Sequence, residues 1–76
     1  MPLPTLTLYT TEHCHLCESA MRLLNHLGVR YCVADILDVE NGLQHYGQRI
    51  PVVRHPAGRE LDWPFSLLDL TDFIAQ

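Results

Sequence analysis

Two cysteines three residues apart, Cys14 and Cys17, lie between an apolar segment and a segment with helical spacing. The residues before them, Leu3–Tyr9, form a strand-like apolar run that ends in a short polar segment. After them, apolar side chains recur at the three- and four-residue intervals of a helix, at Leu16, Ala20, Leu23, Leu24 and Leu27. Both cysteines are therefore expected in the first turn of a helix that directly follows a strand.

This placement gives the two thiols a specific chemistry. Cysteines at this spacing can close a small disulfide, and the N-terminus of a helix favours a thiolate at Cys14. A C-x-x-C sequence beside a strand-helix-strand pattern is typical of a redox-active pair. Two other interpretations stay open for Cys14 and Cys17: binding of a metal ion, or a purely structural role as small hydrophobic residues.

Ionisable side chains surround the pair. A protonated imidazole at His13 or His15 would lower the pKa of the neighbouring thiol, whereas the carboxylates of Glu12 and Glu18 would raise it. The same residues could supply zinc ligands, but no second C-x-x-C or H-x3-H pair exists to complete a closed tetrahedral site. We therefore expect the histidines to modulate the thiol and expect no bound metal.

Size and composition indicate a single domain spanning residues 1–76, with 47% hydrophobic residues and a formal net charge of −4. The basic residues are five in number, all arginine and not clustered, which argues against a nucleic-acid partner. No apolar run approaches the ~18 residues of a membrane span, and the early start of the first strand leaves no room for a signal peptide. We expect a monomeric cytoplasmic protein without membrane contact.

The remaining segments predict a regular alternation of strands and helices. The expected elements are a strand over Leu3–Tyr9, a helix over Cys14–Leu27 ended by Gly28, a strand over Val29–Asp35, a helix over Asp38–Tyr46 with Asp38 as its N-cap and Gly47 at its end, strands over residues 51–55 and Glu60–Trp63, and a last helix capped by Ser66 with Asp69. This order predicts an α/β fold with a four-stranded mixed sheet and helices on both faces. Cys32, in the second strand, is expected in the core.

Three segments resemble the glutaredoxins. Tyr9–Cys17 is similar to their active-site segment, and Gly47–Val52 is similar to the segment around their cis-proline. Glu60–Phe65 further resembles a group of short bacterial glutaredoxin-like proteins. The resemblance covers essentially the whole chain and implies a thioredoxin-like fold with the strand order two-one-three-four.

The resemblance also implies a function, a small dithiol thiol–disulfide oxidoreductase in which Cys14 is the nucleophile and Cys17 the resolving thiol. Pro51 would be cis and packed against the disulfide, and the Ile50 backbone would bind an extended substrate. The implied partners are a disulfide-containing protein or a small thiol as substrate and a reductase as electron donor, with no cofactor. Two alternatives remain: a binding module without catalysis, and a metal or cluster carrier that uses both cysteines.

The chain departs from the glutaredoxins where they bind glutathione. Many of them carry a lysine at the position of Thr11, and a Gly-Gly pair where this chain has Trp63 and Pro64. A large ring and a missing N–H would obstruct the approach of the tripeptide. Arg49 is the cation that could replace the lysine, and Trp63 is either a core aromatic residue or a wall of the substrate groove. We therefore expect weak glutathione binding.

Overall fold

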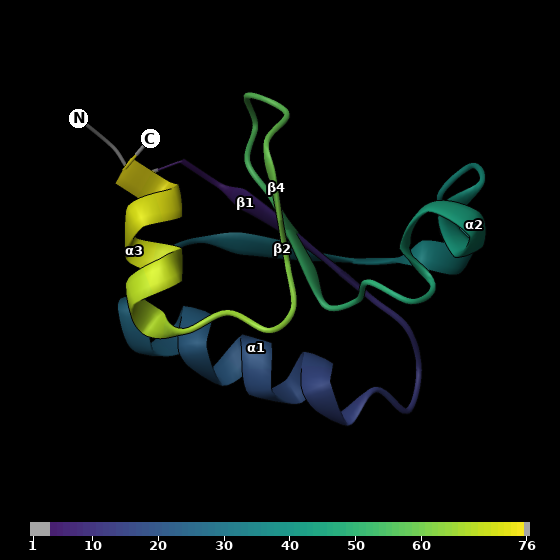
Figure 1. The fold of residues 1–76 in the computed structure, drawn as a ribbon, viewed down its shortest axis with the longest axis horizontal. Coiled ribbons are helices and arrows are strands. Elements are labelled where there is room, and N and C mark those ends of the chain that lie inside the picture. Colours follow the sequence, from purple (N-terminus) through teal and green to yellow (C-terminus); the bar gives the residue numbers. More distant parts are fainter. Residues whose placement is uncertain (1–3, 76) are drawn as a thin grey trace.

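The computed structural model describes residues 4–75 and has a central four-stranded sheet with three helices (Figure 1). In chain order the elements are β1 (Leu6–Thr10), α1 (His15–Leu27), β2 (Tyr31–Asp35), the 3₁₀ helix η1 (Ile36–Asp38), α2 (Gly42–Tyr46), β3 (Val52–Arg54), β4 (Glu60–Asp62) and α3 (Leu67–Ala75). The strand order is β2-β1-β3-β4, with β1 and β2 parallel and the other pairs antiparallel. The mixed α/β sheet predicted from the sequence is confirmed. None of the helices in residues 4–75 could cross a membrane.

Most elements begin and end within a few residues of their predicted limits. Leu3, where the first strand was expected to start, lies outside the described residues. Gly28 ends α1 in the left-handed conformation (φ 71°), where its N–H donates to the carbonyl of Asn25. Ser66 and Asp69 form the predicted capping box at the start of α3, each side chain accepting the other residue's backbone N–H.

One face of the sheet carries the main core. Leu6 and Leu8 of β1 point to this face, and α1 and α3 pack over it side by side (Figure 1). The buried residues of this cluster are Leu6, Leu8, Ala20, Leu24, Val29, Val53, Phe65, Leu70 and Phe73. Burial of this apolar surface holds α1, and with it the cysteine pair, against the end of β1.

Within residues 4–75, the helix on the opposite face is α2, which covers one end of it. Tyr9, which alternates with Leu8 along β1, stacks on Tyr46 with a distance of 4.5 Å between the ring centroids. Figure 1 shows α2 at the end of the molecule away from α3. Helices therefore lie on both sides of the sheet, as expected, but the second side remains largely open.

The prediction that Cys32 is a core residue is wrong, because this open face leaves its side chain exposed. Cys32 is the register partner of Thr7, on the face opposite the core, and β2 is an edge strand. Alternation along the strand assigns Cys32 to one of two faces, and the prediction placed it on the core face, which is the wrong one.

The prediction of Asp38 as a helix N-cap is also wrong. Asp38 ends η1, and α2 begins only at Gly42, after Asn41 in the left-handed conformation (φ 57°). Asp35 caps η1 instead, its Oδ1 atom accepting the Leu37 N–H at 2.9 Å. Gly42 is buried against η1 so closely that a Cβ atom there would collide with the carbonyl oxygen of Ile36. Packing of the buried Ile36 thus shortens the predicted helix to a single turn.

Candidate active site

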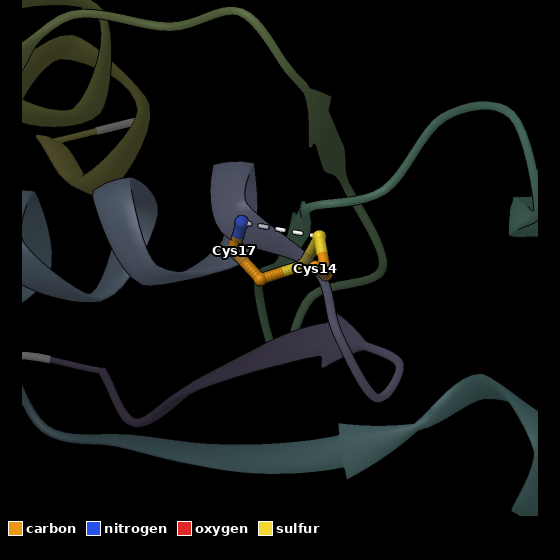
Figure 2. The surroundings of a disulfide bond; sticks show 2 residues. All are labelled: Cys14 and Cys17. Atoms are coloured by element: carbon orange, nitrogen blue, oxygen red, sulfur yellow. Dashed lines mark hydrogen bonds between the residues drawn. A yellow bond between two sulfur atoms is a disulfide. The ribbon is translucent and has the colours of Figure 1, made fainter.

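Cys14 and Cys17 lie where the chain leaves β1 and enters α1, and the two residues form a disulfide (Figure 2). Their Cα atoms are 5.2 Å apart, within the usual range for bridged cysteines. His13, in the left-handed conformation (φ 61°), reverses the chain just before the pair. Cys14 is then the N-cap of α1, with extended backbone angles (φ −96°, ψ 100°). The sharp entry into α1 therefore brings the first cysteine to the helix end and the second one turn further in.

The two sulfur atoms have different surroundings. The backbone N–H of Cys17 donates to the Cys14 Sγ at 3.1 Å, as the dashed line in Figure 2 shows. Cys14 is partly exposed, whereas Cys17 is 2% exposed. A helix N–H directed at the Cys14 sulfur, together with the positive end of the helix dipole, would stabilise a thiolate there once the disulfide is reduced.

A cleft of about 410 Å³ lies beside the disulfide. Its lining residues are Thr10, Thr11, His13, Cys14, His15, Cys17, Glu18 and Met21. Both histidines proposed as modulators of Cys14 therefore face the same cleft as the cysteines. Leu16, between the cysteines, is 49% exposed and adds apolar surface next to the pair.

Pro51 is fully buried and directly precedes β3. The Ile50–Pro51 peptide bond is cis, as is the Trp63–Pro64 bond. The backbone N–H of Ile50 donates to the carbonyl of Tyr46 at 3.0 Å, and the carbonyl of Pro51 accepts the Trp63 N–H at 3.1 Å. The Ile50 N–H is thus already used inside the chain.

Arg49 is held by carboxylates of the neighbouring strand rather than left open to a ligand. Its Nε and Nη2 atoms donate to both carboxylate oxygens of Asp62 at 2.9 and 2.8 Å, and Nη2 also donates to Glu60 at 2.8 Å. The guanidinium lies over the Tyr46 ring, 5.1 Å from its centroid. These hydrogen bonds to Asp62 and Glu60 raise the pKa of Arg49, so the group is a permanent cation that the chain itself neutralises.

The same hydrogen bonds change the pKa values of the acidic partners of Arg49. Hydrogen bonds from Arg49 lower the pKa of Asp62. Burial alone would raise the pKa of Glu60, but hydrogen bonds from Tyr46, Arg49 and Arg54 outweigh it and lower that pKa. The Tyr46 hydroxyl donates to Glu60 at 2.7 Å, which raises the pKa of Tyr46 to about 12. Sequence analysis did not predict this network. The pattern that could have indicated it is the alternation of two acidic residues, Glu60 and Asp62, along β4.

Trp63 belongs to the border of the core. Its ring meets that of Phe65 edge-on, with 5.0 Å between the centroids, and packs against the main cluster. Neither Trp63 nor Arg49 is among the residues that line the cleft beside the disulfide. Of the side chains singled out in the sequence, the cleft brings together Thr11, His13, Cys14, His15, Cys17 and Glu18.

Comparison with known proteins assigns the family. Residues 5–75 match the model of the glutaredoxin-like domain (DUF836). The chain belongs to this family. No curated protein matches this glutaredoxin-like chain.

Solved structures with the same fold support the assignment. The X-ray structure of protein XcR50 from X. campestris is 39% identical, with a TM-score of 0.85 over 92% of this chain and 95% of that one. The solution structure of XcR50 gives a TM-score of 0.82, at 39% identity over 92% of this chain and 91% of that one. Protein Ne2328 from Nitrosomonas europaea has a TM-score of 0.84 at 24% identity, covering 97% of this chain and 94% of that one, and supports the fold alone. The family and the close cysteine pair agree with a redox function.

Proposed function

We propose that this glutaredoxin-like protein is a dithiol thiol–disulfide oxidoreductase. The observation that carries the proposal is the asymmetry of the cysteine pair: Cys14 is a partly exposed residue whose Sγ accepts a helix N–H at 3.1 Å, whereas Cys17 is buried one turn further in. An accessible, stabilised thiolate beside a protected second thiol is the arrangement that exchange through a mixed disulfide requires.

The reaction starts from the reduced pair. The Cys14 thiolate attacks one sulfur of a substrate disulfide; a Cys14–substrate disulfide forms, the substrate S–S bond breaks, and the other substrate sulfur leaves as a thiolate and takes up a proton. Cys17 then loses its proton and attacks the Cys14 Sγ, which releases the second substrate thiol and forms the Cys14–Cys17 disulfide. Two electrons pass from the protein to the substrate, and an external dithiol reductant restores the reduced pair.

The neighbouring residues have supporting roles in this proposal. Pro51 and the Ile50 carbonyl would contact the extended substrate, and His13 and His15 would influence the charge around Cys14. We further propose that the protein acts as a cytoplasmic monomer, supplied with electrons by a reductase, without a bound cofactor or metal.

Glutathione is proposed to be a poor substrate. Thr11 lines the cleft at the position where many glutaredoxins carry a lysine, and Arg49 is engaged by Asp62 and Glu60. A lost charge-assisted hydrogen bond is worth ~1.5–3 kcal/mol, or roughly tenfold to a hundredfold in affinity. Turnover of a glutathione mixed disulfide should therefore be low beside that of a peptide disulfide; efficient glutathione turnover would contradict this part of the proposal.

The decisive experiment is a redox titration of the Cys14–Cys17 pair followed by trapping. It should be done in a Cys32→Ser background, because exposed Cys32 would otherwise react as well. We expect a single two-electron transition between dithiol and disulfide. The additional change Cys17→Ser should accumulate a stable mixed disulfide through Cys14, and the matched change Cys14→Ser should not. A pair that cannot be reduced and reoxidised, or equal trapping by both variants, would overturn the proposal.

A further inference from the structure

The cleft beside the disulfide has an unbalanced charge. Among its lining residues Glu18 is the one carboxylate, and none is an arginine or a lysine. Glu18 lies in the first turn of α1, is exposed, and has no ion-pair partner among residues 4–75. An unpaired carboxylate next to the reacting sulfur atoms attracts a cation and repels an anion.

No arginine is among the residues that line the cleft, so none offsets this charge there. Arg49 and Arg54 are paired with Glu60 and Asp62 on the opposite face of the sheet. Arg22, one helical turn beyond Glu18, donates to the Ser19 hydroxyl at 3.2 Å. The positive end of the α1 dipole faces the Cys14 sulfur and the carboxylate of Glu18. These two groups already compensate its partial charge, so it does not attract a further anionic ligand.

The exposed apolar surface beside the disulfide favours a polypeptide over a small thiol. Leu16 exposes 49% of its surface between the two cysteines, and Met21 adds an apolar wall to the cleft. A cleft of about 410 Å³ with apolar and polar walls can take a side chain adjacent to the scissile disulfide.

We infer that the substrate is a polypeptide disulfide with a basic residue next to its reactive cysteine, and that Glu18 is the specificity-determining residue that receives this cation. The inference rests on the proposed oxidoreductase function and names its substrate class. Binding of an exposed charge pair contributes little to the total affinity, so the preference should be modest, about two- to fivefold at low salt.

The test compares three peptides that carry the same intramolecular disulfide, flanked by lysine, by alanine or by glutamate. Reduction by the protein is followed with dithiothreitol as the dithiol reductant, at about pH 8, where imidazole groups generally carry no charge. The wild-type protein should show a KM about two- to fivefold lower for the lysine peptide than for the alanine peptide, and a higher KM for the glutamate peptide. About 0.5 M salt should reduce these differences.

Glu18→Gln removes the charge while keeping the size of the side chain. It should abolish the lysine preference, measured as the ratio of the KM values for the lysine and alanine peptides. A disturbed helix or an altered Cys14 thiol would change both KM values together and leave this ratio as in the wild type. Glu40→Gln is the matched control, because Glu40 is exposed and does not line the cleft; this variant should keep the full preference. Differences in intrinsic peptide reactivity cancel when each ratio is compared between variants.

The outcomes distinguish the role of Glu18 from the oxidoreductase function. Turnover of all three peptides with equal KM, or a lysine preference that survives Glu18→Gln, would overturn the role of Glu18 and leave the oxidoreductase function standing. No turnover of any peptide would overturn the proposed function itself.

Discussion

At the residue scale, the exposure of a side chain depends on whether another element covers the face on which it lies. Cys32 and Cys17 are both small and apolar, yet one is exposed on an edge strand and the other is 2% exposed at the start of α1. Burial of a free cysteine depends on which element covers its face, whereas its position in the strand decides only which face that is. This has a direct consequence for any thiol measurement on the protein.

Cys32 should react readily in the folded, oxidised protein. A small alkylating reagent added without a reductant is expected to modify one cysteine per chain, since the other two form a disulfide. Mass spectrometry of the intact protein and of its peptides would measure the number and position of the labels. Cys32→Ser should remain unlabelled. No label on the wild type would show that Cys32 is covered.

Gly42 should be required for its lack of a side chain. Helix propensity alone predicts that Gly42→Ala stabilises the protein by up to ~1 kcal/mol. We expect the opposite, a loss of about 1–3 kcal/mol in the free energy of unfolding, because the added Cβ would collide with the carbonyl of Ile36. Urea unfolding measures the sign directly. Gln44→Ala, at an exposed position of α2, is the control and should change stability little.

At the element scale, the helix ends follow local rules. Gly28 ends α1 in the left-handed conformation, and Ser66 with Asp69 starts α3, both as the sequence predicted. These interactions involve residues within a few positions of one another, so they depend little on the rest of the molecule. The start of α2 instead depends on η1, and local propensity misplaced it.

The capping box at α3 should contribute measurably to stability. Ser66→Ala removes the hydroxyl that accepts the Asp69 N–H at 3.1 Å, and we expect a loss of about 0.5–2 kcal/mol in the free energy of unfolding. Ser66→Asn keeps a side-chain acceptor and should retain most of the stability. Thermal or urea unfolding of both variants would test this. Equal stability of Ser66→Ala and the wild type would mean that the cap has no net effect.

At the scale of the whole molecule, the network around Arg49 joins the segment after α2 to β4. Its residues come from positions 46 to 62 and meet on the face of the sheet opposite the main core. The network gives this open face a fixed polar surface, and it uses the cation that the sequence had suggested for a substrate carboxylate.

Acid should weaken the fold partly through this network. The pKa values of Glu60 and Asp62 are lowered in the folded protein, so their stabilising effect is complete above the ordinary carboxyl range and is lost as the pH falls through the lowered values. We expect the free energy of unfolding to fall as the pH drops below about 5, and to fall less in Arg49→Gln.

Urea unfolding across this pH range measures the difference. Arg22→Gln is the matched control: it removes an exposed arginine whose partner is Ser19, and it should keep the pH dependence of the wild type. An Arg49→Gln protein with an unchanged acid profile would show that the ion pairs do not contribute to it.

Residues close together in the chain carry enough information to predict the strand-helix-strand unit, the cysteine pair at a helix start, the glycine and serine caps and the final hairpin and helix. Alternation, helical spacing and capping depend on residues that are close together in the chain. Tertiary structure decided the rest: the exposure of Cys32, the late start of α2, the internal partners of Arg49 and the place of Trp63 outside the cleft. Each of these depends on which residues, far away in the sequence, pack against the residue in the folded protein, and no local pattern specifies those contacts.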